Sequence, residues 1–93
     1  MKPSVILRRI ARAEFDEAAD WYERRRAGQG LKFTAAVRQT LEDLSAWPEA
    51  HPVVHEDVRE ALVSRYPYAI YFRSTPGVIT VLAVFHTSRD PVE

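Results

Sequence analysis

The fold is decided by one stretch of the sequence, Tyr68-Ala69-Ile70-Tyr71-Phe72-Arg73-Ser74-Thr75-Pro76-Gly77-Val78-Ile79-Thr80-Val81-Leu82-Ala83-Val84-Phe85-His86. Its two apolar runs, 68–73 and 78–86, are rich in β-branched and aromatic residues, which favour strands. Thr75-Pro76-Gly77 between them is typical of a tight turn. The stretch therefore predicts an antiparallel hairpin.

Simple alternation in the second strand makes both of its faces apolar. It places Val78, Leu82 and Val84 on one face and Ile79, Val81, Ala83 and Phe85 on the other. This pattern predicts a strand that is covered on both faces, or nearly so.

Upstream of the hairpin, the sequence predicts one further strand at 58–63 and, before Pro48, two helices. Apolar residues recur at helical spacing in 11–26 and again in 30–47. The short connection Ala27-Gly28-Gln29-Gly30 predicts that the two helices form an antiparallel hairpin. Their shared apolar face has to cover the sheet.

Val5-Ile6-Leu7 predicts a first strand within 4–9, whose partner the spacing leaves open, and 48–57 is predicted to be a loop. The chain is therefore predicted to be one α+β domain, residues 1–93. Its parts are an N-terminal strand, an antiparallel αα-hairpin and a three-stranded antiparallel meander, with the helices packed on one face of the sheet.

The amino-acid composition excludes some classes of function and makes others less favoured. The 93 residues contain no cysteine, which excludes disulfides and thiolate chemistry, and no apolar run reaches the ~20 residues of a membrane span. The N-terminus has no signal-peptide pattern, so a cytoplasmic location is expected. Thirteen basic residues balance thirteen acidic ones, and this neutrality disfavours direct binding to nucleic acid.

Metal and cofactor sites are not expected. His51 and His55 have a spacing that would suit metal ligands on a helix, but Pro52 lies between them in a predicted loop. Arg24-Arg25-Arg26 is interpreted as a solvated helix end rather than a phosphate site.

The candidate site is a set of basic residues at the end of the sheet: Arg59, Arg65, His86 and Arg89. In a meander, the end of the last strand returns toward the turn before 68, so His86 is expected near Arg65 and Tyr66. An imidazole beside guanidinium groups suits acid–base chemistry at a phosphate. The alternative is that His86 and Arg89 fix the strand end through hydrogen bonds.

The aromatic residues of 66–72 are a further candidate surface. Alternation places Tyr68, Ile70 and Phe72 on one face, which is predicted to be core. Tyr71 lies on the other face and is the better candidate for contact with a partner.

Several segments together resemble the ParE branch of the RelE/ParE toxin superfamily. They are Ala18-Ala19-Asp20-Trp21-Tyr22-Glu23, Gly30-Leu31-Lys32-Phe33, Arg59, Tyr66-Pro67-Tyr68-Ala69-Ile70-Tyr71-Phe72 and Ala83-Val84-Phe85-His86-Thr87-Ser88-Arg89-Asp90-Pro91. Members of this superfamily are the toxins of type II toxin–antitoxin modules, often called plasmid stabilisation proteins. The resemblance implies a sheet covered by an αα-hairpin and a cognate, ParD-like antitoxin whose C-terminal segment wraps the toxin.

The resemblance also implies one of two activities. ParE-like members poison DNA gyrase by protein contact and are not enzymes, whereas RelE-like members cut messenger RNA on the ribosome without a metal. Zero net charge and the lack of a tyrosine after Tyr71 favour the gyrase poison, with Arg59, Arg65, Tyr71, His86 and Arg89 as contact residues.

In a ribonuclease, the catalytic candidates would be Arg65, His86 and Arg89. A third interpretation is a non-toxic module that only binds the antitoxin, because many relatives continue past Arg-Asp-Pro whereas this sequence ends at Glu93.

Overall fold

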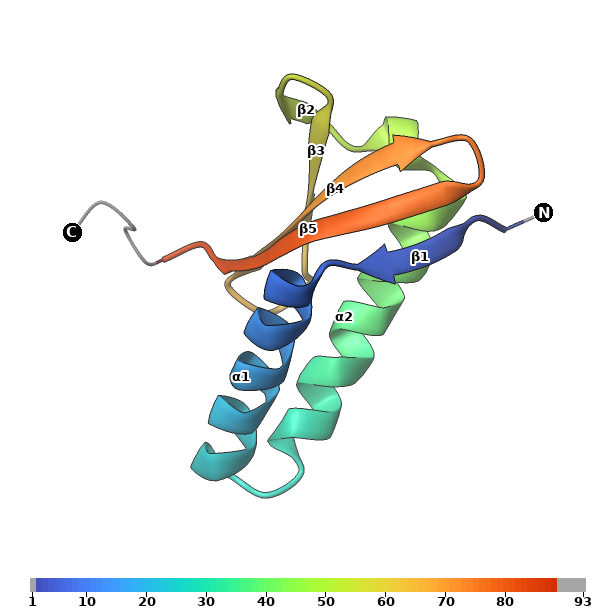
Figure 1. Cartoon of the computed structure of the whole chain (residues 1–93). Helices are drawn as coiled ribbons and strands as arrows, with labels where there is room; N and C mark the ends of the chain where they lie inside the picture. Colours follow the sequence, from blue (N-terminus) through green and yellow to red (C-terminus); the bar gives the residue numbers. More distant parts are fainter. Residues whose placement is uncertain (1, 89–93) are drawn as a thin grey trace.

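The structure, a computed structural model of the chain, describes residues 2–88 and has two layers (Figure 1). The elements are β1 Ser4–Leu7, α1 Arg9–Arg25, α2 Gln29–Ala46, the 3-10 helix η1 Pro48–Ala50, β2 Val53–His55, β3 Val58–Leu62, β4 Tyr68–Thr75 and β5 Val78–His86. Both long helices lie on one face of a single sheet. The α+β class and the αα-hairpin are confirmed. Neither helix within the described range is long and apolar enough to span a membrane.

The sheet has five strands in the order β1-β5-β4-β3-β2. Strands β2 to β5 pair antiparallel in sequence order, whereas β1 pairs parallel to β5, from Ser4 opposite Val78 to Leu7 opposite Val81. The first strand therefore lies beside the last one, a position that the sequence left open.

The loop predicted for 48–57 is wrong in part, because it contains η1 and strand β2. The antiparallel part of the sheet thus has four strands rather than three. Strand β2 is only three residues long and follows Pro52, so it has neither the length nor the alternation by which a strand is recognised.

A β-bulge changes which residues of β5 face the helices. Tyr71 pairs with Ala83 but Phe72 pairs with Val81, so Leu82 is the extra residue. Ile79, Val81 and Val84 are the buried side chains of β5, each at most 3% exposed. The simple alternation and the coverage of both faces are therefore wrong, since the helices cover one face only (Figure 1).

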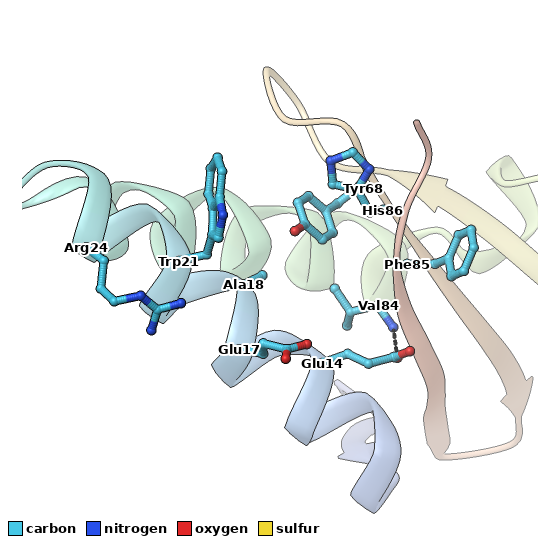
Figure 2. Close-up of a pocket in the computed structure, with 9 residues that line it drawn as sticks. All are labelled: Glu14, Glu17, Ala18, Trp21, Arg24, Tyr68, Val84, Phe85 and His86. Atoms are coloured by element: carbon cyan, nitrogen blue, oxygen red, sulfur yellow. Dashed lines mark hydrogen bonds between the residues drawn. The ribbon is translucent and has the colours of Figure 1, made fainter. Parts of the chain in front are cut away.

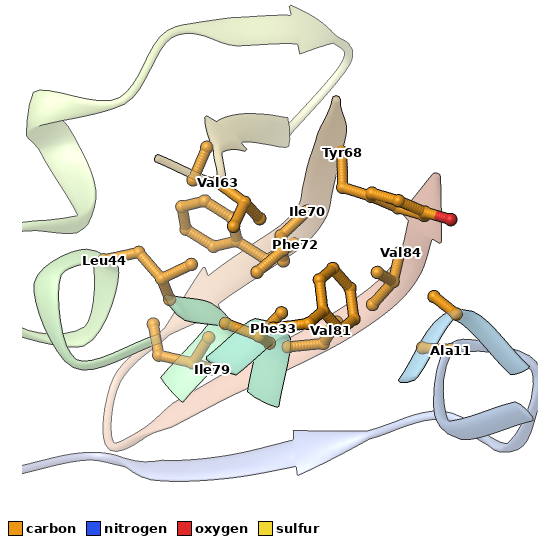
Figure 3. Packing of buried hydrophobic residues seen from close by; sticks show 13 residues of the cluster. Ala11, Phe33, Leu44, Val63, Tyr68, Ile70, Phe72, Ile79, Val81 and Val84 are labelled. Atoms are coloured by element: carbon orange, nitrogen blue, oxygen red, sulfur yellow. The ribbon is translucent and has the colours of Figure 1, made fainter. Parts of the chain in front are cut away.

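The core lies between this face and the helices (Figure 3). Its largest fully buried side chains are Phe33, Leu44, Ile70, Phe72 and Ile79. As predicted, Tyr68, Ile70 and Phe72 all belong to the core.

The tip of the αα-hairpin depends on Glu23 and two glycines. The Glu23 carboxylate accepts hydrogen bonds from the backbone N–H groups of Gly28, at 3.0 Å, and Gly30, at 2.9 Å. Gly28 has a left-handed backbone with φ of 90°, which glycine adopts without strain. At Gly30 the helices approach so closely that an added Cβ would lie 2.9 Å from the Ala19 carbonyl oxygen.

Gly30→Ala is therefore expected to destabilise the protein, although alanine normally favours a helix over glycine. The forced separation of the helices should cost about 1–3 kcal/mol, which lowers the melting temperature of so small a domain by roughly 5–20 °C. Thermal unfolding followed by circular dichroism measures the change, with Arg38→Ala at an exposed position of α2 as the control. A melting temperature at or above that of the wild type would contradict this account of the hairpin.

The Glu23 contact also predicts a pH dependence. The Gly28 and Gly30 N–H groups lower the pKa of Glu23 below its ordinary value of 4.5. The folded state then binds this proton less tightly than the unfolded state does, so the contact stabilises above pH 4.5 and is lost as pH falls through the lowered pKa.

We expect wild type to melt above Glu23→Gln at neutral pH, and the difference to shrink on acidification. Melting both proteins between neutral pH and about pH 3 tests this. A difference that stays constant over that range would show that the carboxylate charge has no part in the contact.

Candidate functional site

A pocket of about 230 Å³ lies between α1 and the end of β5 (Figure 2). Its polar and aromatic lining comes from Glu14, Glu17, Trp21, Arg24, Tyr68 and His86, with Ala18, Val84 and Phe85 completing it. His86 is thus the one residue of the predicted basic set, within residues 2–88, that lines this pocket.

Helix α1 supplies one wall because four of its side chains share a face. Glu14, Glu17, Trp21 and Arg24 follow one another at spacings of three, four and three residues, which places them along one side of a helix. The Glu14 carboxylate accepts a hydrogen bond of 2.9 Å from the Val84 backbone N–H. It thereby accepts a hydrogen bond from a part of β5 that lies past the end of β1 and, within residues 2–88, has no neighbouring strand on that side.

His86 is held at the end of β5 by the chain on both sides of it. Its ring lies edge-on to Tyr68, with 5.0 Å between ring centroids, and its Nδ1 accepts a 3.2 Å hydrogen bond from the Ser88 N–H. The Thr87 N–H donates to the Pro67 carbonyl oxygen at 2.8 Å. These contacts resemble the predicted role of fixing the strand end, and the hydrogen bond within residues 2–88 uses Nδ1 rather than Nε2.

Trp21 is the exposed aromatic side chain at the rim of the pocket, with 41% of its surface accessible. The Arg25 guanidinium lies 4.8 Å from its ring centroid, and Tyr22 packs edge-on to it. The tryptophan is therefore both oriented and accessible, which suits a contact residue.

Arg65 does not line the His86 pocket. It has a left-handed backbone with φ of 73° and lines a different cavity, of about 420 Å³, between α2 and the end of β3. The structure instead places His86 beside Pro67 and Tyr68. Tyr66 packs into the core against Phe33, with ring centroids 5.2 Å apart.

The remaining candidates lie elsewhere. Arg59 is partly buried and its Nη1 donates 2.6 Å to the His51 carbonyl oxygen, so it ties η1 to the sheet. Arg89 lies outside the described residues. Arg59, Arg65 and His86, the members of the predicted basic set within residues 2–88, thus lie in separate parts of the structure.

Tyr71 lies on the face of the sheet without helices, as expected, and is half-buried beside Phe85. Its hydroxyl donates 2.9 Å to Glu60. Burial, together with this carboxylate, raises the pKa of Tyr71 above its ordinary value of 10.0. Tyr71 therefore stays a neutral hydrogen-bonding group at physiological pH.

No group of three potential metal ligands occurs in the described part of the chain. His55 is exposed, and its Nε2 lies 3.7 Å from a carboxylate oxygen of Glu56. The site thus offers an imidazole, carboxylates, a guanidinium and aromatic faces as its chemistry.

Sequence reasoning missed the contribution of α1. The predicted site residues were Arg59, Arg65, Tyr71, His86 and Arg89, and none of them belongs to this helix. The three-and-four spacing of Glu14, Glu17, Trp21 and Arg24 was the signal, because an exposed tryptophan in a polar helical stripe has no role in the core.

The sequence matches one known protein family, and the fold is similar to those of two solved toxin–antitoxin structures. A family profile described as "ParE toxin of type II toxin-antitoxin system, parDE" matches residues 5–91. A solved structure of the chromosomal ParDE toxin–antitoxin system from P. aeruginosa has a TM-score of 0.80 and 21% identity, covering 94% of this chain and 98% of that one. The RelBE2 toxin–antitoxin complex from Mycobacterium tuberculosis has a TM-score of 0.66 and 19% identity, covering 96% and 95%. No curated protein matches.

Glu14→Ala is expected to destabilise the protein by about 1 kcal/mol, because the Val84 N–H loses its acceptor in a partly buried position. Glu14→Gln is the control, since its amide oxygen still accepts the bond. Chemical denaturation of both variants gives the two free energies of unfolding. Equal losses would mean that the carboxylate charge, rather than the hydrogen bond, matters here.

Proposed function

The chain belongs to the ParE toxin family of type II toxin–antitoxin systems, and from this membership we propose that it inhibits DNA gyrase by direct protein contact. A cognate antitoxin encoded beside it would neutralise it, as its ParDE and RelBE2 neighbours in structure are complexes of that kind. Such a module would serve to stabilise the plasmid or chromosomal region that carries it.

The charge of the pocket between α1 and the end of β5, which His86 lines, supports a protein rather than an RNA as the target. Two carboxylates, Glu14 and Glu17, line it with a single guanidinium, that of Arg24. Carboxylates repel the phosphates of an RNA strand, and Arg65, a catalytic candidate for a ribonuclease, lines another cavity. A pocket with an accessible tryptophan and mixed charges suits a protein surface better, because Trp, Tyr and Arg dominate such contacts.

The second candidate is a ribosome-dependent ribonuclease, which one observation favours. His86 and Glu17 line the same pocket, so an imidazole and a carboxylate are available as acid and base. Primer extension on a message translated with the purified protein tests this directly. New cuts that disappear in His86→Ala would replace the gyrase proposal.

Purified wild-type protein, with gyrase and ATP, is expected to convert supercoiled plasmid into cleaved complexes. Trp21→Ala and His86→Ala should each need roughly tenfold more protein for the same effect, since truncation of a central contact residue commonly costs 1–2 kcal/mol or more. Arg38→Ala, at an exposed position of α2 outside the pocket, is the control and should act as wild type.

Two outcomes would contradict this proposal in different ways. No cleaved complexes at micromolar wild-type protein would remove gyrase as the target. If both pocket variants are as active as wild type, gyrase remains the target but the pocket is not the surface that contacts it. Growth arrest on expression without an antitoxin separates a toxin from a non-toxic antitoxin-binding module.

A further inference from the structure

The pocket between α1 and the end of β5 carries an unbalanced negative charge. Two carboxylates, Glu14 and Glu17, line it together with one guanidinium, that of Arg24. The Nδ1 of His86 accepts the Ser88 N–H, so this nitrogen carries no proton there and the imidazole adds no charge. The lining groups therefore leave a net of one negative charge, which one cation would neutralise.

The two carboxylates of the pocket differ in what the chain itself supplies to them. The Glu14 Oε1 accepts the Val84 N–H at 2.9 Å. No hydrogen bond or ion pair among residues 2–88 involves the Glu17 side chain. An ionised carboxylate is bound most strongly by charged donors, and a guanidinium can donate two parallel N–H bonds to it. Glu17 is therefore the group in this pocket that a cationic ligand would engage.

Two aromatic rings form the other side of the pocket. Figure 2 shows the Trp21 and Tyr68 rings in the upper part of the view and the Glu14 and Glu17 carboxylates below them. The chain itself shows that Trp21 attracts a guanidinium, because that of Arg25 lies 4.8 Å from its ring centroid. With Arg25 in place, Trp21 is still partly exposed. An aromatic face beside a carboxylate suits a planar cation, which stacks on the ring and donates N–H bonds from its edge.

The size of the pocket suits one long side chain rather than a cofactor. Its volume of about 230 Å³ is below the ~300 Å³ at which pockets for drug-sized ligands begin. A second hollow, of about 220 Å³, adjoins it, because Trp21, Tyr68 and His86 line both. The rest of that hollow is lined by Tyr22 and Pro67, which are uncharged. A chain segment that crosses from one to the other would place a cation in the first and an apolar side chain in the second.

We propose that this pocket binds an arginine side chain of the target protein, with an apolar neighbour of that arginine in the adjoining hollow. The guanidinium stacks on Trp21, donates N–H bonds to Glu17 and neutralises the net charge of the pocket. Lysine fits less well, because its ammonium is not planar and cannot donate two parallel bonds in a fixed geometry. The inference rests on the proposed contact between this pocket and gyrase, and it names the chemistry by which the pocket recognises its target.

The first test uses a peptide and needs no gyrase. Acetyl-Ala-Leu-Arg-Leu-Ala-amide is titrated into isotope-labelled full-length protein, and the indole N–H signal of Trp21 should shift at roughly millimolar peptide. Citrulline in place of the arginine keeps the shape of the side chain and removes its charge. The citrulline peptide should bind at least about tenfold more weakly, and a lysine peptide should bind roughly threefold to tenfold more weakly.

Glu17→Gln separates the charge of the pocket from its shape. Glu17 is exposed on α1, and a thermal melt confirms that the variant is folded. Its preference for the arginine peptide over the citrulline peptide should fall to about twofold or less. In the gyrase cleavage assay it should need roughly fivefold to tenfold more protein than wild type. Glu42→Gln, at an exposed position of α2 outside the pocket, is the matched control and should act as wild type in both assays.

Equal binding of the arginine and citrulline peptides overturns the proposal, as does the absence of any shift at about 10 mM peptide. A tenfold gain in peptide affinity on Arg89→Gln also overturns it, because an arginine of the chain itself, outside the described residues, is then the occupant. Glu17→Gln that poisons gyrase as well as wild type does shows that the target places no arginine here. If wild type binds the arginine peptide but forms no cleaved complexes, the arginine site stands and the gyrase proposal alone fails.

Discussion

The packing of α1 against β5 is the contact on which the rest of the structure depends. Strand β1 spans only Ser4–Leu7, so it covers the first half of β5 and the chain must then enter the helix. Helix α1 consequently runs past the second half of β5, where Glu14 accepts the Val84 N–H in place of a neighbouring strand. The bulge at Leu82 turns Val84 toward the helix and so completes this contact.

The same contact creates the pocket to which we assign a role. Beyond β1, the gap between α1 and β5 becomes the pocket of Trp21 and His86, with two carboxylates in its wall. A neutral chain can thus present an acidic, aromatic pocket, which requires no basic excess.

The sequence predicts much of the fold because its long elements have clear periods. The two helices show helical spacing over many residues, β5 is a long run of β-branched and apolar residues, and Tyr68, Ile70 and Phe72 are buried as alternation requires. Strand β2 was not predictable, since three residues after a proline show no period. The bulge at Leu82 was not predictable either, because an extra residue shifts the alternation of the strand without changing its composition. Of the residues that line the pocket, only His86 was among the predicted site residues, because the packing of α1 against β5 brings the two walls together and the spacing along α1 alone does not show what it faces.

Hydrogen exchange of the protein alone and bound to gyrase tests the central claim, that the α1–β5 pocket is the surface presented to the target. The account predicts slower exchange in the segments 21–24 and 84–87 of the complex, and unchanged exchange in β2. Protection confined to β2 and β3, with α1 and the end of β5 unchanged, would contradict it.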